Sequence, residues 1–132
     1  VAKMATDIML KNNDGGSIIN IASILAERVG LNLSSYASAK AALVQLTKSM
    51  ALELARSNIR VNALAPGYIL TEINQDFFNT DEGKSYIGKI PMKRLGLENE
   101  LDGALLLLAS NASSFMTGSV ITVDGGHVVN PL

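Results

Sequence analysis

Residues 17–22 read Ser17-Ile18-Ile19-Asn20-Ile21-Ala22, an almost continuous apolar run. The run lacks the alternation of a half-exposed strand, which is typical of a strand covered on both faces, as in a parallel sheet. Asp14-Gly15-Gly16 comes directly before it and predicts the turn that ends a first helical segment. We therefore expect a buried parallel strand at residues 17–22, and this expectation decides the fold class.

The segments that follow alternate in type. The expected elements are a helix from Ser34 or Ser35 to about Arg56, a strand at 59–65, a helix at 98–110 and a strand at 119–123. Pro66-Gly67 ends the second strand, and the irregular region at 67–96 has room for two short helices. Such alternation predicts an α/β fold with a parallel sheet.

Two apolar patterns concern how the helices pack. The long helix carries a stripe of larger residues, which we expect on the sheet, and a stripe of smaller ones, which suits either a subunit interface or the first helix. The larger stripe is Ala39, Leu43, Leu46, Met50 and Leu54, and the smaller is Ala37, Ala41, Val44, Ala51 and Ala55. The run Leu105–Leu108 is apolar all round, so we expect it to be buried on more than one side.

Composition excludes several classes of function. The 132 residues, 48% of them apolar, suffice for one domain with a core. Eleven basic and twelve acidic residues give a net charge of -1 without a block of like charge, so we expect no nucleic-acid partner. The absence of cysteine and the single histidine argue against a metal site. We find no signal-like segment and no apolar stretch near the roughly 20 residues of a membrane span, and we expect a cytoplasmic protein without a membrane partner.

Three polar residues indicate a chemistry. Tyr36 and Lys40 lie four residues apart, hence on one helix face, and Ser23 follows the first strand. A nearby ammonium favours the phenolate of a tyrosine, whose pKa is ordinarily about 10, and so prepares it for proton transfer. A serine at the carboxyl end of a parallel strand can hydrogen-bond a substrate oxygen. The three residues predict proton transfer on a carbonyl or an alcohol.

Taken alone, Tyr36 and Lys40 also fit an ordinary helix with a solvated lysine. Ser23 and the Pro66-Gly67 turn favour the catalytic interpretation, and longer segments then resemble the short-chain dehydrogenase/reductase family. The matching segments are Gly16–Ser23, Tyr36–Lys40, Asn58–Gly67 and Phe115–Gly126. The resemblance covers nearly the whole chain.

The resemblance implies a Rossmann-like, doubly wound parallel sheet, NAD or NADP as cofactor, and a homo-oligomer, either dimer or tetramer. It implies that Tyr36 is the general acid/base, that Ser23 orients the substrate carbonyl, and that Lys40 lowers the tyrosine pKa and holds the nicotinamide ribose. By the same resemblance, the cofactor-binding residues are Tyr36, Lys40, Pro66, Gly67, Ile69 and Thr71.

The chain also departs from the family pattern. The family's glycine-rich dinucleotide turn, its Asn-Ala-Gly strand and its catalytic asparagine have no counterpart here. We therefore expect residues 1–132 to be the catalytic, carboxyl-terminal half of such a domain, with about three strands and without the amino-terminal dinucleotide-binding half. The isolated chain should be inactive and bind NAD(P) very weakly. Three outcomes follow for the open edge of the sheet: the other half is present in the natural protein, a second copy of the chain takes its place, or the chain refolds around this edge.

The implied activity is hydride transfer between NAD(P) and a small secondary alcohol or ketone, with a preference for a sugar acid or polyol. One alternative is a 3-oxoacyl carrier-protein reductase, for which Lys84, Lys89, Lys93 and Arg94 could dock an acidic carrier. Another is a non-catalytic fragment that only self-associates.

The remaining aromatic residues admit two interpretations. Four of the six aromatic residues lie in the irregular region at 67–96, where they either form a substrate lid or anchor the loop to the core: Tyr68, Phe77, Phe78 and Tyr86. For His127, near the carboxyl end, we expect a solvated surface position.

Overall fold

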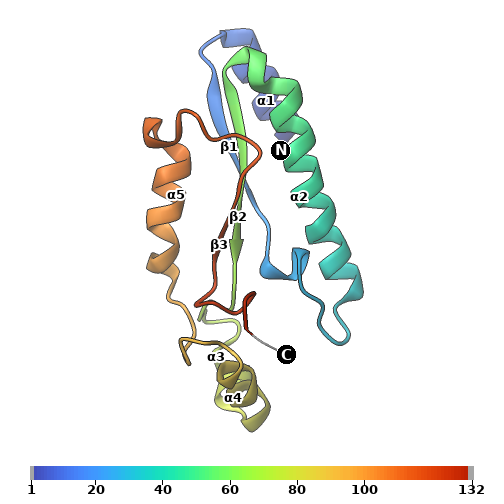
Figure 1. Cartoon of the computed structure of the whole chain (residues 1–132), viewed down its shortest axis with the longest axis vertical. Helices are drawn as coiled ribbons and strands as arrows, with labels where there is room; N and C mark the ends of the chain where they lie inside the picture. Colours follow the sequence, from blue (N-terminus) through green and yellow to red (C-terminus); the bar gives the residue numbers. More distant parts are fainter. Residues whose placement is uncertain (1, 131–132) are drawn as a thin grey trace.

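A computed structural model describes residues 2–130, in which three parallel strands lie between helices (Figure 1). The strands are β1 (Gly16–Ile21), β2 (Ile59–Pro66) and β3 (Val120–Val123), and β2 lies in the middle. The α-helices are α1 (Ala2–Asn12), α2 (Ser34–Leu54), α3 (Gln75–Asn79), α4 (Asp81–Gly88) and α5 (Asp102–Ala109). Short 3-10 turns are η1 (Ile24–Ala26), η2 (Ala55–Ser57), η3 (Glu98–Leu101) and η4 (Asn111–Ser113). The predicted fold class is confirmed.

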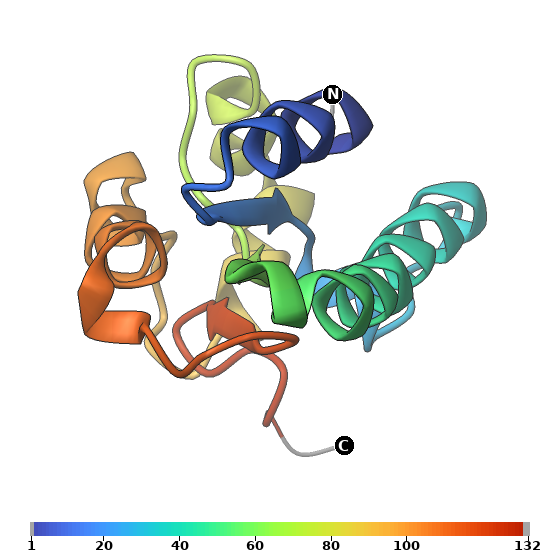
Figure 2. The ribbon, with the colours of Figure 1, turned by 90° about the horizontal axis from the view of Figure 1, so that it is seen from above.

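The strand register brings the carboxyl ends of all three strands to one end of the sheet. Gly16 lies opposite Ile59 at the start of the β1–β2 pair, and Pro66 lies opposite Val123 at the end of the β2–β3 pair. Parallel neighbours need a crossover connection, which α2 and α5 provide. Figure 2 shows these two helices on opposite sides of the strands. The middle strand β2 is therefore covered on both faces, but the expected burial of residues 17–22 holds only in part. Ile18 and Ala22 are buried, whereas Ile21 is 50% exposed, because β1 lies at the edge of the sheet.

The core is centred on β2. Its residues Val61, Asn62 and Ala63 have no exposed surface. Two apolar clusters involve this strand: the first is Ile18, Ala51, Ile59 and Val61 with Met9, Met50 and Leu54, and the second is Ala22, Ala63 and Ala65 with Val44 and Val120. Burial on both faces fixes β2 and, through it, the loop that follows Pro66.

The face of α2 that packs on the sheet differs from the predicted one. Ala39 is exposed and Leu46 is 48% exposed, whereas Thr47 and Ala51 are buried. The reason is a polar contact: the Thr47 hydroxyl accepts a hydrogen bond from Asn20 Nδ2 at 2.9 Å and donates to the Leu43 carbonyl at 2.8 Å. This bond turns Thr47 toward β1, and small neighbours such as Ala51 let the helix approach closely.

The prediction for the leucine run of α5 is also wrong. Leu108 is fully buried, but Leu106 is 67% exposed. A helix on the outside of a sheet turns only one stripe inward, so the other leucines of the run face away. No helix within residues 2–130 is both long and apolar enough to cross a membrane.

The loops at the carboxyl end of the sheet touch one another. Gly67 donates a backbone hydrogen bond to Val123 at 2.9 Å, and a Cβ atom at Gly67 would lie 2.6 Å from the Cβ of Asp124. Glycine is therefore required for the close approach of these two loops. Figure 1 shows α3 and α4 beyond this end of the sheet.

Candidate active site

Ser23 lies where β1 gives way to η1. It is the N-cap residue of that turn and is almost completely buried. Its Oγ accepts a hydrogen bond from the Leu25 backbone N–H at 3.1 Å. Since a serine hydroxyl both accepts and donates, its proton stays available for another oxygen.

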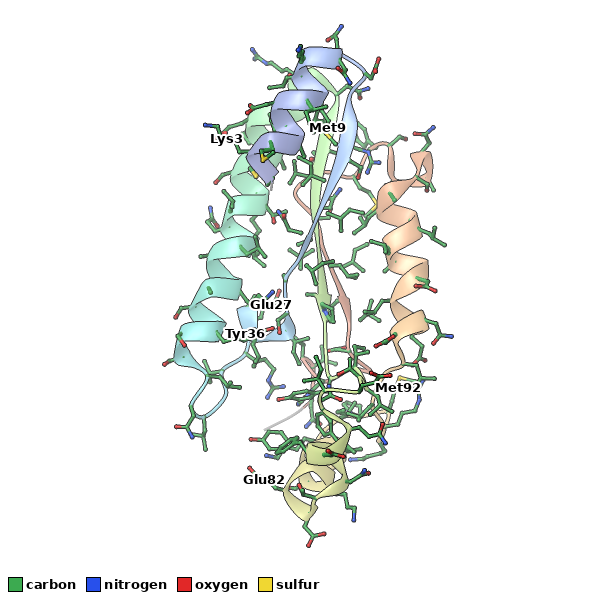
Figure 3. The ribbon with its side chains drawn as sticks, turned by 180° about the vertical axis from the view of Figure 1, so that it is seen from behind. Lys3, Met9, Glu27, Tyr36, Glu82 and Met92 are labelled. Atoms are coloured by element: carbon green, nitrogen blue, oxygen red, sulfur yellow. The ribbon has the colours of Figure 1, made fainter. Side chains whose placement is uncertain are left out.

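Lys40 and Tyr36 lie in the first turns of α2, which packs against η1. Lys40 Nζ donates to the Ile21 carbonyl at 2.8 Å, two residues before Ser23, and lies 5.6 Å from the centre of the Tyr36 ring. Figure 3 shows Tyr36 near Glu27, at the end of η1. The ammonium thus joins the carboxyl end of β1 to the phenol, and the three predicted catalytic residues gather around that strand end.

Both helical residues can reach a bound molecule. Tyr36 is 45% exposed, so its ring is accessible. Lys40 has three N–H donors, of which one is used on the Ile21 carbonyl. The other two donors suit a pair of ribose hydroxyl groups, so this residue fits the predicted nicotinamide ribose.

The four predicted cofactor residues of the β2 loop follow one another at the strand's end. Pro66 closes β2, Gly67 packs on Asp124, and Ile69 forms a bridge with Gly96. Thr71 donates its backbone N–H to Asn74 Oδ1 at 2.9 Å. Ile69 and Thr71 line two different hollows, so the loop does not form one continuous wall. The assignment of these residues to the cofactor stays a prediction.

A pocket of about 250 Å³ lies beside the serine. One wall comes from the segment between Ser23 and Tyr36. The others come from the irregular region 67–96, called the lid region below, and from the carboxyl-terminal segment. The lining residues are Ile24, Leu25, Arg28, Val29, Gly30, Leu31, Leu33, Tyr68, Tyr86, Lys89 and His127. Arg28 was not predicted as a site residue, although its position five residues after Ser23 indicates that it lies near the candidate site.

The loop aromatics divide between the two predicted roles. Phe78 is buried and packs edge-on against Tyr68, with ring centres 5.6 Å apart, so it anchors the loop. Tyr68 and Tyr86, 6.0 Å apart, line the pocket. Burial, and to a lesser extent Tyr86, raises the pKa of Tyr68, which keeps its hydroxyl protonated as a hydrogen-bond donor.

The expectation of a solvated His127 is wrong. Its ring lies 5.4 Å from the ring of Tyr68, and within residues 2–130 its buried Nδ1 has no hydrogen-bond partner. Arg28 Nη1 holds this segment by donating to the His127 carbonyl at 2.7 Å and the Val128 carbonyl at 3.1 Å. Burial, followed by the charge of Arg28, lowers the pKa of His127 and favours the neutral ring.

The chain resembles known proteins along nearly its whole length. A family model described as Enoyl-(Acyl carrier protein) reductase matches residues 1–128. The 2-dehydro-3-deoxy-D-gluconate 5-dehydrogenase of Dickeya dadantii (strain 3937) is 42% identical over 118 residues, which are 89% of this chain and 47% of that protein. The 3-oxoacyl acyl-carrier-protein reductase FabG of Chlamydia pneumoniae is 43% identical over 111 residues, 84% of this chain and 44% of that protein.

Several solved structures are similar to this chain in both fold and sequence, among them one that holds a cofactor. The gluconate 5-dehydrogenase of Burkholderia cenocepacia J2315, in complex with NADP and tartrate, matches with a TM-score of 0.92 at 37% identity. The match covers 98% of this chain and 51% of the other. The chain spans about half the length of the curated relatives it matches.

Proposed function

Because this chain belongs to the short-chain dehydrogenase/reductase family, we propose that the protein containing it transfers a hydride between NAD(P) and a secondary alcohol or ketone. The observation that carries the proposal is the position of Lys40, bonded to the end of β1 and close to the ring of Tyr36. Residues 1–132 form the catalytic part of a larger Rossmann domain in this proposal.

Each of the three residues has its own part in the reaction. Tyr36 passes its phenolic proton to the carbonyl oxygen during reduction and takes it back during oxidation. Ser23 donates a hydrogen bond from its hydroxyl to the same oxygen, without giving up the proton, and holds that oxygen beside the phenol. The nicotinamide, when bound, gives or accepts the hydride.

Lys40 positions the cofactor by donating to its ribose hydroxyl groups. Pro66, Gly67, Ile69 and Thr71 border the nicotinamide in this proposal, since they follow the carboxyl end of β2, where open parallel sheets bind ligands. The related dehydrogenase from Burkholderia cenocepacia was solved with NADP. The proposal covers both NAD and NADP, because the residues named here contact only the nicotinamide half.

The contacts of the four cations in the irregular region 67–96 favour a sugar acid over a carrier-bound acyl thioester as the substrate. Three of the four predicted docking cations already have partners: Lys84 with Asp81 at 3.8 Å, Lys93 with the Gly88 carbonyl, and Arg94 with both Glu100 oxygens at 2.7 Å. The fourth, Lys89, lines the pocket beside Ser23. Only Lys84 and Arg94 are paired with carboxylates, so about half of the predicted docking charge is neutralised, which weakens the case for an acidic carrier protein.

The protein also self-associates in this proposal, in the cytoplasm. Met4 and Ile8 on α1 are mostly exposed, and α1 and α2 share a hollow lined in part by Leu46 and Met50. An exposed apolar surface on two neighbouring helices suits a second copy of the chain. The sequence contains no cysteine, which accords with a reducing compartment.

The test is hydride transfer by the full-length protein and its Tyr36→Phe variant. The wild-type protein should oxidise or reduce hydroxy acids or polyols with NAD(P), followed by nicotinamide absorbance. The variant lacks only the phenolic hydroxyl, so it should lose nearly all turnover while its unfolding temperature stays the same. Unchanged turnover in the variant would rule out Tyr36 as the acid/base.

A further inference from the structure

The pocket beside Ser23 is placed to hold the part of a substrate that does not react. Its wall begins at Ile24, directly after Ser23, and reaches Leu33, three residues before Tyr36. Ser23 and Tyr36 are not among the described lining residues, but the segment that joins them forms this wall, so a molecule whose reacting carbon lies between the serine and the tyrosine has this space beside it. The volume of about 250 Å³ is slightly below the roughly 300–1,000 Å³ of usual ligand pockets, which favours a small molecule.

The charge of this pocket is one-sided. Arg28 and Lys89 line it, and neither Asp nor Glu is among its described lining residues. Within residues 2–130, the two ion pairs are Lys84–Asp81 and Arg94–Glu100, so neither pocket cation has a carboxylate partner. Two cations without a counter-ion in a partly enclosed space attract an anion.

Both cations have donors to spare. Arg28 uses Nη1 on the carbonyls of His127 and Val128, and within residues 2–130 the rest of its planar fork has no hydrogen-bond partner and can bind a carboxylate. Lys89 Nζ lies 4.9 Å from the ring centre of Tyr86, a contact that uses no hydrogen bond. The neutral ring of His127 and the hydroxyl of Tyr68 add uncharged polar groups of the kind that hydroxylated ligands need.

Building on the hydride transfer proposed above, we propose that this pocket binds the carboxylate of a small hydroxy acid or keto acid, with Arg28 and Lys89 as its contacts. The substrate is then held at two points. Its carbinol or carbonyl carbon lies at Ser23 and Tyr36, and its carboxylate lies between the cations of the loop and the lid. Lys89 lies in the pocket lining, whereas Lys84 and Arg94 lie outside it and are paired with carboxylates.

The experiment measures how strongly the full-length protein prefers an acid over a neutral analogue. Matched pairs such as D-gluconate with D-sorbitol and 3-hydroxybutyrate with 2-butanol are compared as kcat/KM with NAD and NADP. We expect kcat/KM to be at least about tenfold higher for the acid, because the free energy of one charge-assisted hydrogen bond corresponds to a factor of about ten. Lys89→Gln and Arg28→Gln should each reduce the preference by about tenfold.

Lys84→Gln is the matched control, since it removes the same charge from α4, which ends directly before Lys89, but lies outside the pocket lining. It should leave the preference unchanged. Arg28 also holds the carboxyl-terminal segment, so Lys89→Gln decides the matter if Arg28→Gln fails to fold. Equal use of neutral substrates, a preference for sugar phosphates over acids, or an unchanged preference in Lys89→Gln overturns this inference and leaves hydride transfer standing. No turnover of any pair overturns both proposals.

Discussion

Replacing Lys40 with Met tests the central contact of the candidate site. The substitution removes the 2.8 Å bond to the Ile21 carbonyl and the two donors proposed for the cofactor ribose. Two charge-assisted hydrogen bonds at about 1.5 kcal/mol each give about 3 kcal/mol, or a fall of about 150-fold in kcat/KM. The Ile21 bond is exposed to solvent, so its loss should change the unfolding temperature of the full-length protein little.

The assay is steady-state kinetics with cofactor and substrate varied in turn, together with fluorescence titration of NAD(P)H. We expect both a weaker cofactor affinity and a lower kcat/KM. Lys48→Met is the control, because it removes the same charge from an exposed position two turns further along α2. If Lys40→Met keeps its cofactor affinity and kcat/KM within about threefold of wild type, the role proposed for this ammonium is wrong.

Three further substitutions test the scaffold in the full-length protein. Thr47→Val leaves the Asn20 side-chain amide without its buried acceptor, and it should lower the free energy of unfolding by about 1–3 kcal/mol in urea titrations. Gly67→Ala places a Cβ atom 2.6 Å from that of Asp124, so the loops must separate; a loss of about 1–3 kcal/mol should accompany weaker cofactor binding, and unaltered stability would contradict the close contact. Hydrogen bonds from Arg94 and from the Leu97 N–H lower the pKa of Glu100 to about 2, so its charge stabilises the folded protein above the ordinary value of 4.5 and ceases to do so as the pH falls toward 2. Glu100→Gln should therefore flatten the acid limb of stability against pH, and an identical limb in both proteins would argue against the ion pair.

The fold could be predicted because its signals are local. The apolar run of β1 and the Pro66-Gly67 stop of β2 lie within single segments, so each predicts a strand or its end without reference to the rest of the chain. The burial of β1 was not predictable in this way, since it depends on what covers the edge of the sheet. The inward face of α2 could not be predicted in the same way. It depends on a hydrogen bond between Asn20 and Thr47, 27 positions apart, and hydrophobicity alone assigns a threonine to the outside.

In the candidate site, too, contacts between neighbouring residues could be predicted from the sequence, and contacts between distant residues could not. Tyr36 and Lys40 are one helical turn apart, so their contact follows from spacing. The environment of His127 depends on Arg28, 99 positions earlier in the chain. No local pattern brings these two residues together, and a lone histidine near a chain end is most simply interpreted as solvated. The basic pocket is invisible in the sequence for the same reason, since its lining comes from three distant segments.

The structure separates the groups proposed for chemistry from those proposed for selectivity. Lys40 is bonded to the end of a strand whose neighbour is buried on both faces, so the groups proposed to react lie beside the most completely buried part of the sheet. Arg28 and Lys89 lie in connecting segments, which tolerate change more easily than the sheet does. Two relatives named for different substrates, a sugar acid and an acyl thioester, are almost equally similar to the chain, at 42% and 43% identity. The division between scaffold and pocket accounts for this similarity. Overall identity is dominated by the shared scaffold, so the substrate has to be inferred from the few residues that line the pocket.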